Sequence, residues 1–212
     1  MTMELVSYVL LVVMGIVPIA NPFSTAPLFI AMTAHASKSE KQKTVTLACI
    51  YMFIILTVFL LLGSLILQFF GISLQSIRIA GGLIIGYMGF RMLFPADAVA
   101  ADIDDQETKN YRTLAFTPLA LPMLSGPGSI SVVLAMATEI ATVEDFTHRI
   151  IGYGVVGFGI LLSSLICWLV LWSSGGVVRL LGNTGIEAIT KLMGFLLVCI
   201  GAEFVVTGSG LG

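Results

Sequence analysis

The sequence predicts an all-α integral membrane protein, with six transmembrane helices arranged as two inverted three-helix repeats. Three observations lead to this fold class: an apolar composition, six long apolar stretches, and a proline-rich motif that occurs twice. Of the 212 residues, 58% are hydrophobic and only 10% are charged, whereas a soluble domain usually carries about 25% charged residues. Most of the surface must therefore face the hydrocarbon of a lipid bilayer.

Composition and charge argue against several classes of function. The formal net charge is −2, and no basic stripe is long enough to follow a phosphate backbone, so we expect no nucleic-acid partner. Cys49, Cys167 and Cys199 lie in apolar runs without CxxC spacing, and His35 and His148 lie in polar links. We therefore expect no disulfide framework, no metal and no cofactor. We also expect no enzyme activity, because no nucleophile with a nearby base is identifiable.

The six apolar stretches are each long enough to cross a bilayer, which takes about 20 residues. They cover residues 5–33, 45–67, 74–94, 113–138, 150–172 and 186–206. The first and fourth contain the strings PIANPFSTAP and PLALPMLSGPG, which run from Pro18 to Pro27 and from Pro118 to Gly128. Because proline removes a backbone donor and clashes with the preceding turn, helices 1 and 4 should both be broken at these motifs.

The two proline-rich strings are copies of one motif. A shift of 100 residues superimposes three prolines of each string, and the two strings hold six of the seven prolines in the chain. A shift of 112 residues pairs Gly82 with Gly194 and Gly89 with Gly201. The third span of each half therefore also corresponds, and we expect Gly82 and Gly194 at close contacts between helices.

The repeats cover residues 1–94 and 113–212, and an acidic, charged linker over residues 95–112 joins them. Each half has an odd number of spans, so the second half enters the membrane from the opposite face and the repeat is inverted. Inverted repeats with interrupted helices at matching positions are typical of secondary transporters, whose substrate lies near the bilayer midplane. In the alternative interpretation, the duplicated prolines only kink the helices and help them to pack.

The orientation follows from the basic residues, because lysine and arginine are retained on the cytoplasmic side. Only Arg78 and Arg149 lie on one side of the membrane, and the other eight lie on the opposite side. The linker is then cytoplasmic and both termini lie outside the cytoplasm, in the periplasm if the host is a Gram-negative bacterium. The eight residues are Lys38, Lys41, Lys43, Arg91, Lys109, Arg112, Arg179 and Lys191.

Four strings carry a resemblance to a known family: IANPFSTAPLF, FGISLQSIRIAGGL, PLALPMLSGPGSI and GIEAITKLMGFLLVCIGAEF. Together they resemble the MarC family of bacterial integral membrane proteins, which includes the SnatA-type transporters of small neutral amino acids. The resemblance covers essentially the whole chain. It implies six spans in the cytoplasmic membrane and transport of glycine, alanine and similar solutes.

We place the predicted substrate site between the two breaks. A helix that restarts after a break presents free N–H groups and the positive end of its dipole, which suit a carboxylate. Asn21 is the best single candidate for orienting a substrate or for closing the broken backbone, while Gly126 and Gly128 allow close approach of the backbone. The predicted substrate-binding residues are Asn21, Pro22, Ser24, Thr25, Ser125, Gly126, Pro127, Gly128 and Ser129.

The predicted function is secondary transport of a small polar metabolite, with neutral amino acids such as glycine or alanine as substrates, by alternating access. The expected partners are the lipid bilayer, the substrate and a coupling ion. H⁺ and Na⁺ are both open choices, because no acidic residue lies deep in a span and backbone carbonyls at the breaks can hold Na⁺. A passive channel and a non-transporting membrane scaffold are the alternatives, and dependence of uptake on an ion gradient would separate them from a transporter.

Overall fold

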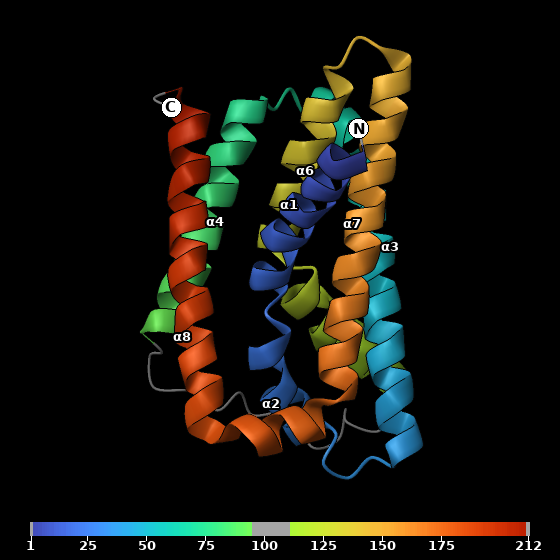
Figure 1. Ribbon diagram of the computed structural model, residues 1–212, viewed down its shortest axis with the longest axis vertical. Coiled ribbons are helices and arrows are strands. Elements are labelled where there is room, and N and C mark those ends of the chain that lie inside the picture. Colours follow the sequence, from blue (N-terminus) through green and yellow to red (C-terminus); the bar gives the residue numbers. More distant parts are fainter. Residues whose placement is uncertain (1, 95–110, 211–212) are drawn as a thin grey trace.

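The computed structural model describes residues 2–94 and 111–210, and all regular structure in these residues is helical. Most of the helices lie side by side along the long axis of the molecule (Figure 1). In chain order the elements are α1 (Thr2–Ala20), α2 (Pro22–Met32), α3 (Lys38–Phe70), α4 (Leu74–Leu93), α5 (Tyr111–Leu114), the widely wound segment η2 (Ala115–Leu124), α6 (Pro127–Ala141), α7 (Phe146–Trp172) and α8 (Ser174–Ser209).

Local sequence sets the ends of these helices. At the start of α3, the Glu40 backbone N–H donates to Ser37 Oγ at 3.3 Å, and the Ser37 N–H donates to Glu40 Oε2 at 2.8 Å. This reciprocal capping box satisfies two donors that a helix start otherwise leaves unpaired. α3 ends at Gly71, whose left-handed backbone (φ 64°) costs glycine little. Ser73 and Asp145 cap the starts of α4 and α7, where each side chain accepts a hydrogen bond from a backbone N–H of the first turn.

Three helices are long and apolar enough to cross a membrane: α3, α7 and residues 184–209 of α8. Two further spans arise if each bent pair counts as one, namely α1 with α2, bent by 41°, and residues 112–124 with α6, bent by 63°. By length and composition the described residues therefore provide up to five spans. α4 has 20 residues but is not among them, because Gln75, Arg78 and Arg91 lower its hydropathy.

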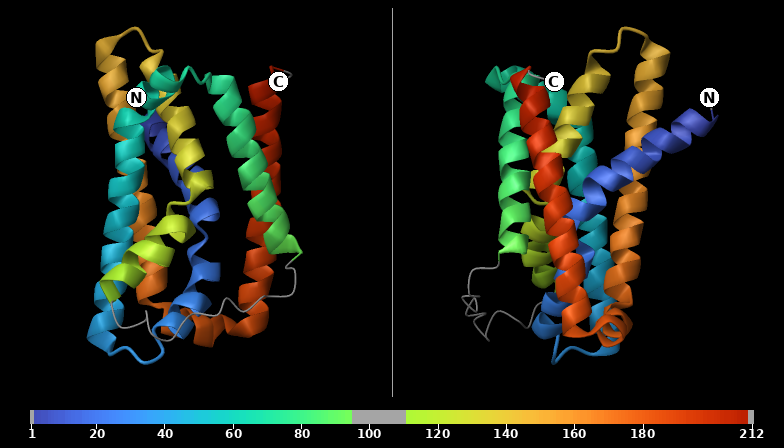
Figure 2. Two further views of the ribbon diagram at one scale, coloured as in Figure 1. Left: turned by 180° about the vertical axis from the view of Figure 1, so that it is seen from behind. Right: turned by 60° about the vertical axis from the view of Figure 1, so that its left-hand side comes forward.

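The helices alternate in direction along the bundle (Figures 1 and 2). α1 and α2 lead away from the end that carries the N-terminus, α3 returns to it, and α4 leads away again. η2 and α6 return, α7 leads away, and α8 returns, so both termini lie at one end of the bundle. We call this the terminal end and the opposite one the distal end.

α8 contains a sharp turn that the sequence analysis did not predict. Gly182 has φ 63° and ψ 179°, a backbone conformation that is essentially restricted to glycine. Residues 174–181 consequently lie across the distal end, and residues 184–209 run along the bundle axis (Figure 1). The polar link that we expected between the fifth and sixth spans is therefore mostly helical.

Two clusters of buried apolar side chains hold the bundle together. The larger draws its members from α1, α2, α3, α5, η2, α6 and α7, with Met52 and Ile160 fully buried inside it. The smaller joins α4 and α8 to α1 and α6. Large apolar side chains such as Leu65 and Phe90 are exposed on the outer surface, as expected where helices face lipid. The smaller cluster consists of Ile19, Ile85, Val132 and Leu197.

α4 and α8 pack backbone against backbone (Figure 2). A Cβ atom on Gly82 would lie 2.5 Å from the carbonyl oxygen of Gly201, and one on Gly89 would lie 2.5 Å from that of Gly194. Any side chain at these positions would push the helices apart, which is why small residues occupy helix contacts in membranes. The prediction that Gly82 and Gly194 lie at close helix contacts is confirmed, and Gly201 and Gly89 are their partners.

Candidate functional site

The first break separates α1 from α2 at Asn21. This residue has a left-handed backbone (φ 38°, ψ 65°), and only 6% of it is exposed. Pro22 is buried at the first position of α2, where its missing N–H would have had no helical partner. The structure therefore resolves the predicted break of the first span into a single residue, with a helix on each side.

The side chain of Asn21 organises a polar cluster at this break. Its Oδ1 accepts a hydrogen bond from the Ser24 N–H at 3.3 Å, and its Nδ2 donates to Ser24 Oγ at 2.6 Å and to Met92 Sδ at 3.6 Å. Ser24 Oγ lies 2.6 Å from Thr190 Oγ1 of α8. Thr25 Oγ1 donates to the Asn21 carbonyl at 3.1 Å. The first break is thus connected to both α4 and α8.

Met92 and Thr190 extend the cluster beyond the residues that we predicted. They lie in α4 and α8, which are helical at these positions, and nothing in their sequence neighbourhood marks them. Sequence offers only an indirect indication of their role: both residues lie in the third span of their repeat. Their part in the cluster becomes visible only when the helices are packed together.

The second break is longer than the first. Thr117 and Leu121 have extended backbones (φ −124°, ψ 121° and φ −124°, ψ 125°), and each precedes a proline. Residues before proline avoid the helical conformation, so the chain in η2 winds in wide, irregular turns. Gly126 is also extended (φ −70°, ψ 178°), and α6 begins directly after it.

Serine hydroxyls satisfy carbonyl groups that this break frees. Ser125 Oγ donates to the Ala120 carbonyl at 2.8 Å, and Ser129 Oγ donates to the Leu124 carbonyl at 3.2 Å. Both serines are fully buried, where lipid would offer the backbone no partner. Gly126, the residue before α6, provides no side-chain cap, so the N–H groups of the first turn of α6 receive no capping side chain.

The two breaks meet inside the bundle (Figure 1). A Cβ atom on Gly128, in the first turn of α6, would lie 2.9 Å from Ile19 Cγ2 at the end of α1 and 3.3 Å from Ile85 Cγ1 of α4. Gly126 is buried against the carbonyl of Pro122. Pro127 differs from the other predicted site residues because it is exposed, which puts it at the edge of this region.

Two surface hollows lie away from the breaks. One of about 770 Å³ lies between α1, α6 and α7, with Glu139 and His148 among its lining residues. Another of about 200 Å³ lies between α2, α3, α7 and α8, where Lys38 and Lys41 contribute to its wall. None of the nine predicted site residues lines either hollow. The breaks are packed against their neighbours and do not open into these spaces.

Known proteins place the chain in a family. The sequence matches the MarC family of integral membrane proteins over residues 6–210. The inner membrane protein MarC of Escherichia coli O1:K1 is 37% identical over 204 residues, which cover 91% of this chain and 90% of that protein. The inner membrane protein MarC of Citrobacter koseri is 38% identical over 202 residues, with the same two coverages. No solved structure gives a significant match.

These matches confirm the resemblance that the four sequence strings indicated. They extend over nearly the full length of both chains, and the helical structure with its long apolar spans agrees with a protein of the membrane. The chain belongs to the MarC family of integral membrane proteins.

Proposed function

We propose that this chain is a secondary transporter of a small polar metabolite, with neutral amino acids such as glycine or alanine as substrates, and that it works by alternating access. The observation that carries the proposal is the contact of the two broken spans through Gly128 and Ile19. Breaks inside a membrane bundle free backbone groups that lipid cannot satisfy but a polar solute can. The substrate site lies between the breaks near the midplane, and the function requires neither catalysis nor a cofactor.

The polar groups at the breaks suit a zwitterion. The first turn of α6 has no capping side chain and can present N–H groups and a positive dipole end to a carboxylate. The hydroxyls of Thr25, Ser125 and Ser129 donate their protons to backbone carbonyls, so their oxygens keep lone pairs that can accept from an ammonium group. The tight packing around Gly128 favours a small substrate.

Glycine contacts support an inverted repeat in which α4 also counts as a span, which brings the number of spans to six. The sequence shift relates Gly82 to Gly194 and Gly89 to Gly201, whereas the structure pairs Gly82 with Gly201 and Gly89 with Gly194. Exchanging the halves turns each contact into the other, as expected for two repeats related by a two-fold axis. α4 is assigned as a span because it packs along α8.

This assignment makes residues 1–94 and 113–212 the two repeats and residues 95–112 their cytoplasmic linker. Residues 95–110 of that linker lie outside the described residues, and Tyr111 and Arg112 belong to α5. The charges at either end of the bundle are the basis for calling the linker cytoplasmic.

We assign the chain to the bacterial inner membrane, as a multi-pass protein with both termini in the periplasm. Relatives are named inner membrane proteins, and the two termini lie at one end of the bundle. Arg78 and Arg149 follow closely on the starts of α4 and α7, at that terminal end. Lys38 and Lys41 open α3 at the distal end and Arg91 closes α4 there, so the excess of basic residues favours a cytoplasmic distal end.

A passive channel and a membrane scaffold are the competing functions. The close packing of Gly128 against Ile19 and Ile85 favours a transporter over a channel, because a channel needs an open path between the breaks. Gly128 at the second break also favours a solute site over a simple packing kink, because glycine lets a ligand approach the backbone closely. The coupling ion of the proposed transporter is H⁺ or Na⁺.

Uptake by purified protein in liposomes tests the proposal. Radiolabelled glycine, alanine and serine are offered with an imposed Na⁺ gradient, with an imposed pH gradient, and with neither. A secondary transporter accumulates one of these solutes above its external concentration only when the coupling gradient is present. A channel brings the solute to equal concentrations regardless of the gradient, and a scaffold leaves uptake at the level of empty liposomes.

A further inference from the structure

α4 and residues 184–209 of α8 form one body within the molecule. Their backbones touch at Gly82 and Gly201 and again at Gly89 and Gly194, with no side chain between them. A contact of this kind allows neither helix to rotate or slide without a clash. The larger apolar cluster contains no member from α4 or from residues 184–209, so the rest of the bundle has its own separate core.

Apolar contact between the two bodies centres on the smaller cluster, against which the partly buried Met92 and Phe204 also pack. The smaller cluster joins Ile85 of α4 and Leu197 of α8 to Ile19 of α1 and Val132 of α6. This cluster has far fewer buried members than the core of the rest of the bundle, which makes it a suitable pivot for the α4–α8 body. Rigid-body rotation about such a contact is one of the common forms of conformational change in proteins.

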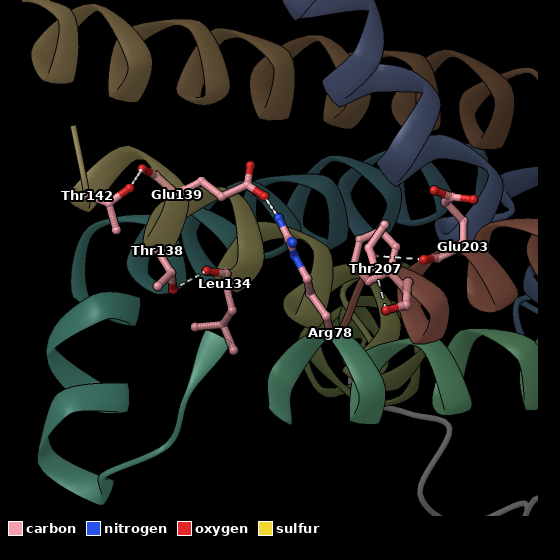
Figure 3. A network of polar contacts seen from close by, with 8 residues as sticks. Arg78, Leu134, Thr138, Glu139, Thr142, Glu203 and Thr207 are labelled. Atoms are coloured by element: carbon pink, nitrogen blue, oxygen red, sulfur yellow. Dashed lines mark hydrogen bonds and ion pairs between the residues drawn. The ribbon is translucent and has the colours of Figure 1, made fainter. Parts of the chain in front are cut away.

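Polar contacts connect the two bodies on either side of this cluster. Toward the terminal end, Arg78 of α4 extends to Glu139 of α6 and forms an ion pair (Figure 3). The two side chains are 28% and 51% exposed. Toward the distal end, Ser24 of α2 meets Thr190 of α8 at 2.6 Å. Both contacts are closed in this structure.

We propose that α4 and residues 184–209 of α8 rotate as one body against the rest of the bundle, and that the Arg78–Glu139 ion pair is the clasp that closes the terminal end. The inference rests on the proposed transport function, because it supplies the gate on one side of the substrate site. An ion pair is suited to this task because it joins the bodies without filling space between them. Opening the clasp lets the terminal end separate while the smaller cluster stays in place.

Distances between spin labels in the full chain, reconstituted in lipid nanodiscs, test the clasp. One pair of labels, at Gln75→Cys and Glu144→Cys, spans the two bodies at the terminal end. A second pair, at Gln75→Cys and Ser209→Cys, lies within the α4–α8 body. Cys199, the exposed native cysteine, is replaced by alanine, while Cys49 and Cys167 stay because they are buried.

Arg78→Ala and Glu139→Gln should each raise the population with a long Gln75–Glu144 distance by about two- to fivefold, the range expected for a partly exposed ion pair. The charge swap Arg78→Glu with Glu139→Arg should return the distribution toward that of the wild type. The matched control is Lys191→Ala, which removes the Lys191–Glu187 ion pair of 2.7 Å inside α8 and should change nothing.

Unchanged Gln75–Glu144 distances in both single variants would overturn the clasp, and so would a charge swap that opens the protein as much as either single variant. A Gln75–Ser209 distance that changes along with the first would overturn the single moving body. These measurements need no solute. Absent uptake with the expected distance changes contradicts the proposed transport, whereas normal uptake with unchanged distances contradicts the clasp.

Discussion

Asn21 combines a left-handed backbone with a side chain that caps the next helix. Its backbone is left-handed with φ 38°, a conformation that asparagine tolerates better than other side chains with a Cβ atom. Its side chain also accepts from the Ser24 N–H, which is the usual role of asparagine before a helix. One residue can therefore end α1, start α2 and contact α4 through Met92.

Replacing Asn21 separates these two roles. Asn21→Ala loses the cap and places alanine in a strained conformation, so it should lower the stability by about 1–3 kcal/mol. Asn21→Gly keeps the backbone relaxed and should lose only a few tenths of a kcal/mol from the missing cap. Thermal unfolding in detergent should rank the wild type first, glycine next and alanine last. Equal midpoints for alanine and glycine would show that the left-handed backbone does not matter here.

At the scale of residues, the sequence predicts the polar content of each break but not its partners. Asn21 and Ser24 could be identified because they interrupt an apolar span between prolines. Thr190 could not, because it lies 166 residues from Ser24 and its contact depends on how α8 is rotated in the bundle. Exposure of Pro127 was hidden for the same reason.

At the scale of elements, the α4–α8 pair depends on the absence of side chains. Gly89→Leu should destabilise the protein by about 1–3 kcal/mol or more, since overpacking forces backbone shifts and the Gly194 carbonyl lies 2.5 Å from the position of the new Cβ. Gly86→Leu is the control, because nothing lies within 4 Å of a Cβ built there. Detergent unfolding midpoints should fall for Gly89→Leu only. A similar fall for both would mean that a leucine anywhere on α4 lowers the stability, and that the contact with Gly194 is not the cause.

The turn inside α8 depends on glycine at position 182, which can be tested separately. Gly182→Ala should lower the stability by about 1–3 kcal/mol, because alanine is strained at φ 63°. Gly176→Ala, where a Cβ would meet open space, should be neutral or slightly stabilising, since alanine favours a helix more than glycine does. The same unfolding assay compares them. If Gly182→Ala were as stable as Gly176→Ala, residues 174–181 would continue the helix without the turn.

The elements differ in how well sequence predicts them. Long apolar periodic stretches such as α3 and α7 are evident from hydropathy, and the proline-rich strings mark both bent pairs. The winding of η2 is less evident, because Pro118 and Pro122 mark a break but do not show that Ser125 will bond to the Ala120 carbonyl. Residues 174–181 lie between the stretches predicted as spans over 150–172 and 186–206, so a helix there was not expected.

At the scale of the whole molecule, the proposed topology places both termini outside the cytoplasm. Alkaline phosphatase, which is active only after export, should be active when fused to Gly212. Green fluorescent protein should fluoresce when fused after Phe94, at the distal end of α4. Fluorescence at Gly212 with an inactive phosphatase would reverse the orientation or change the number of spans.

In the proposed function, a small solute crosses the membrane between the two breaks. A side chain at Gly128 would collide with Ile19 and alter the place where they meet. Gly154 provides a matched control, because a Cβ there would have no atom within 4 Å. Both variants therefore add the same valine to a helix of the bundle, at the proposed site in one case and away from it in the other.

The most direct measurement is gradient-driven uptake of radiolabelled glycine and alanine by liposomes that contain equal amounts of the wild type, Gly128→Val or Gly154→Val. We expect saturable uptake by the wild type and by Gly154→Val, and a loss of at least about tenfold for Gly128→Val, comparable to losing one hydrogen bond to a charged group. Uptake by Gly128→Val at the wild-type rate, or no uptake of either amino acid by the wild type, would contradict the account.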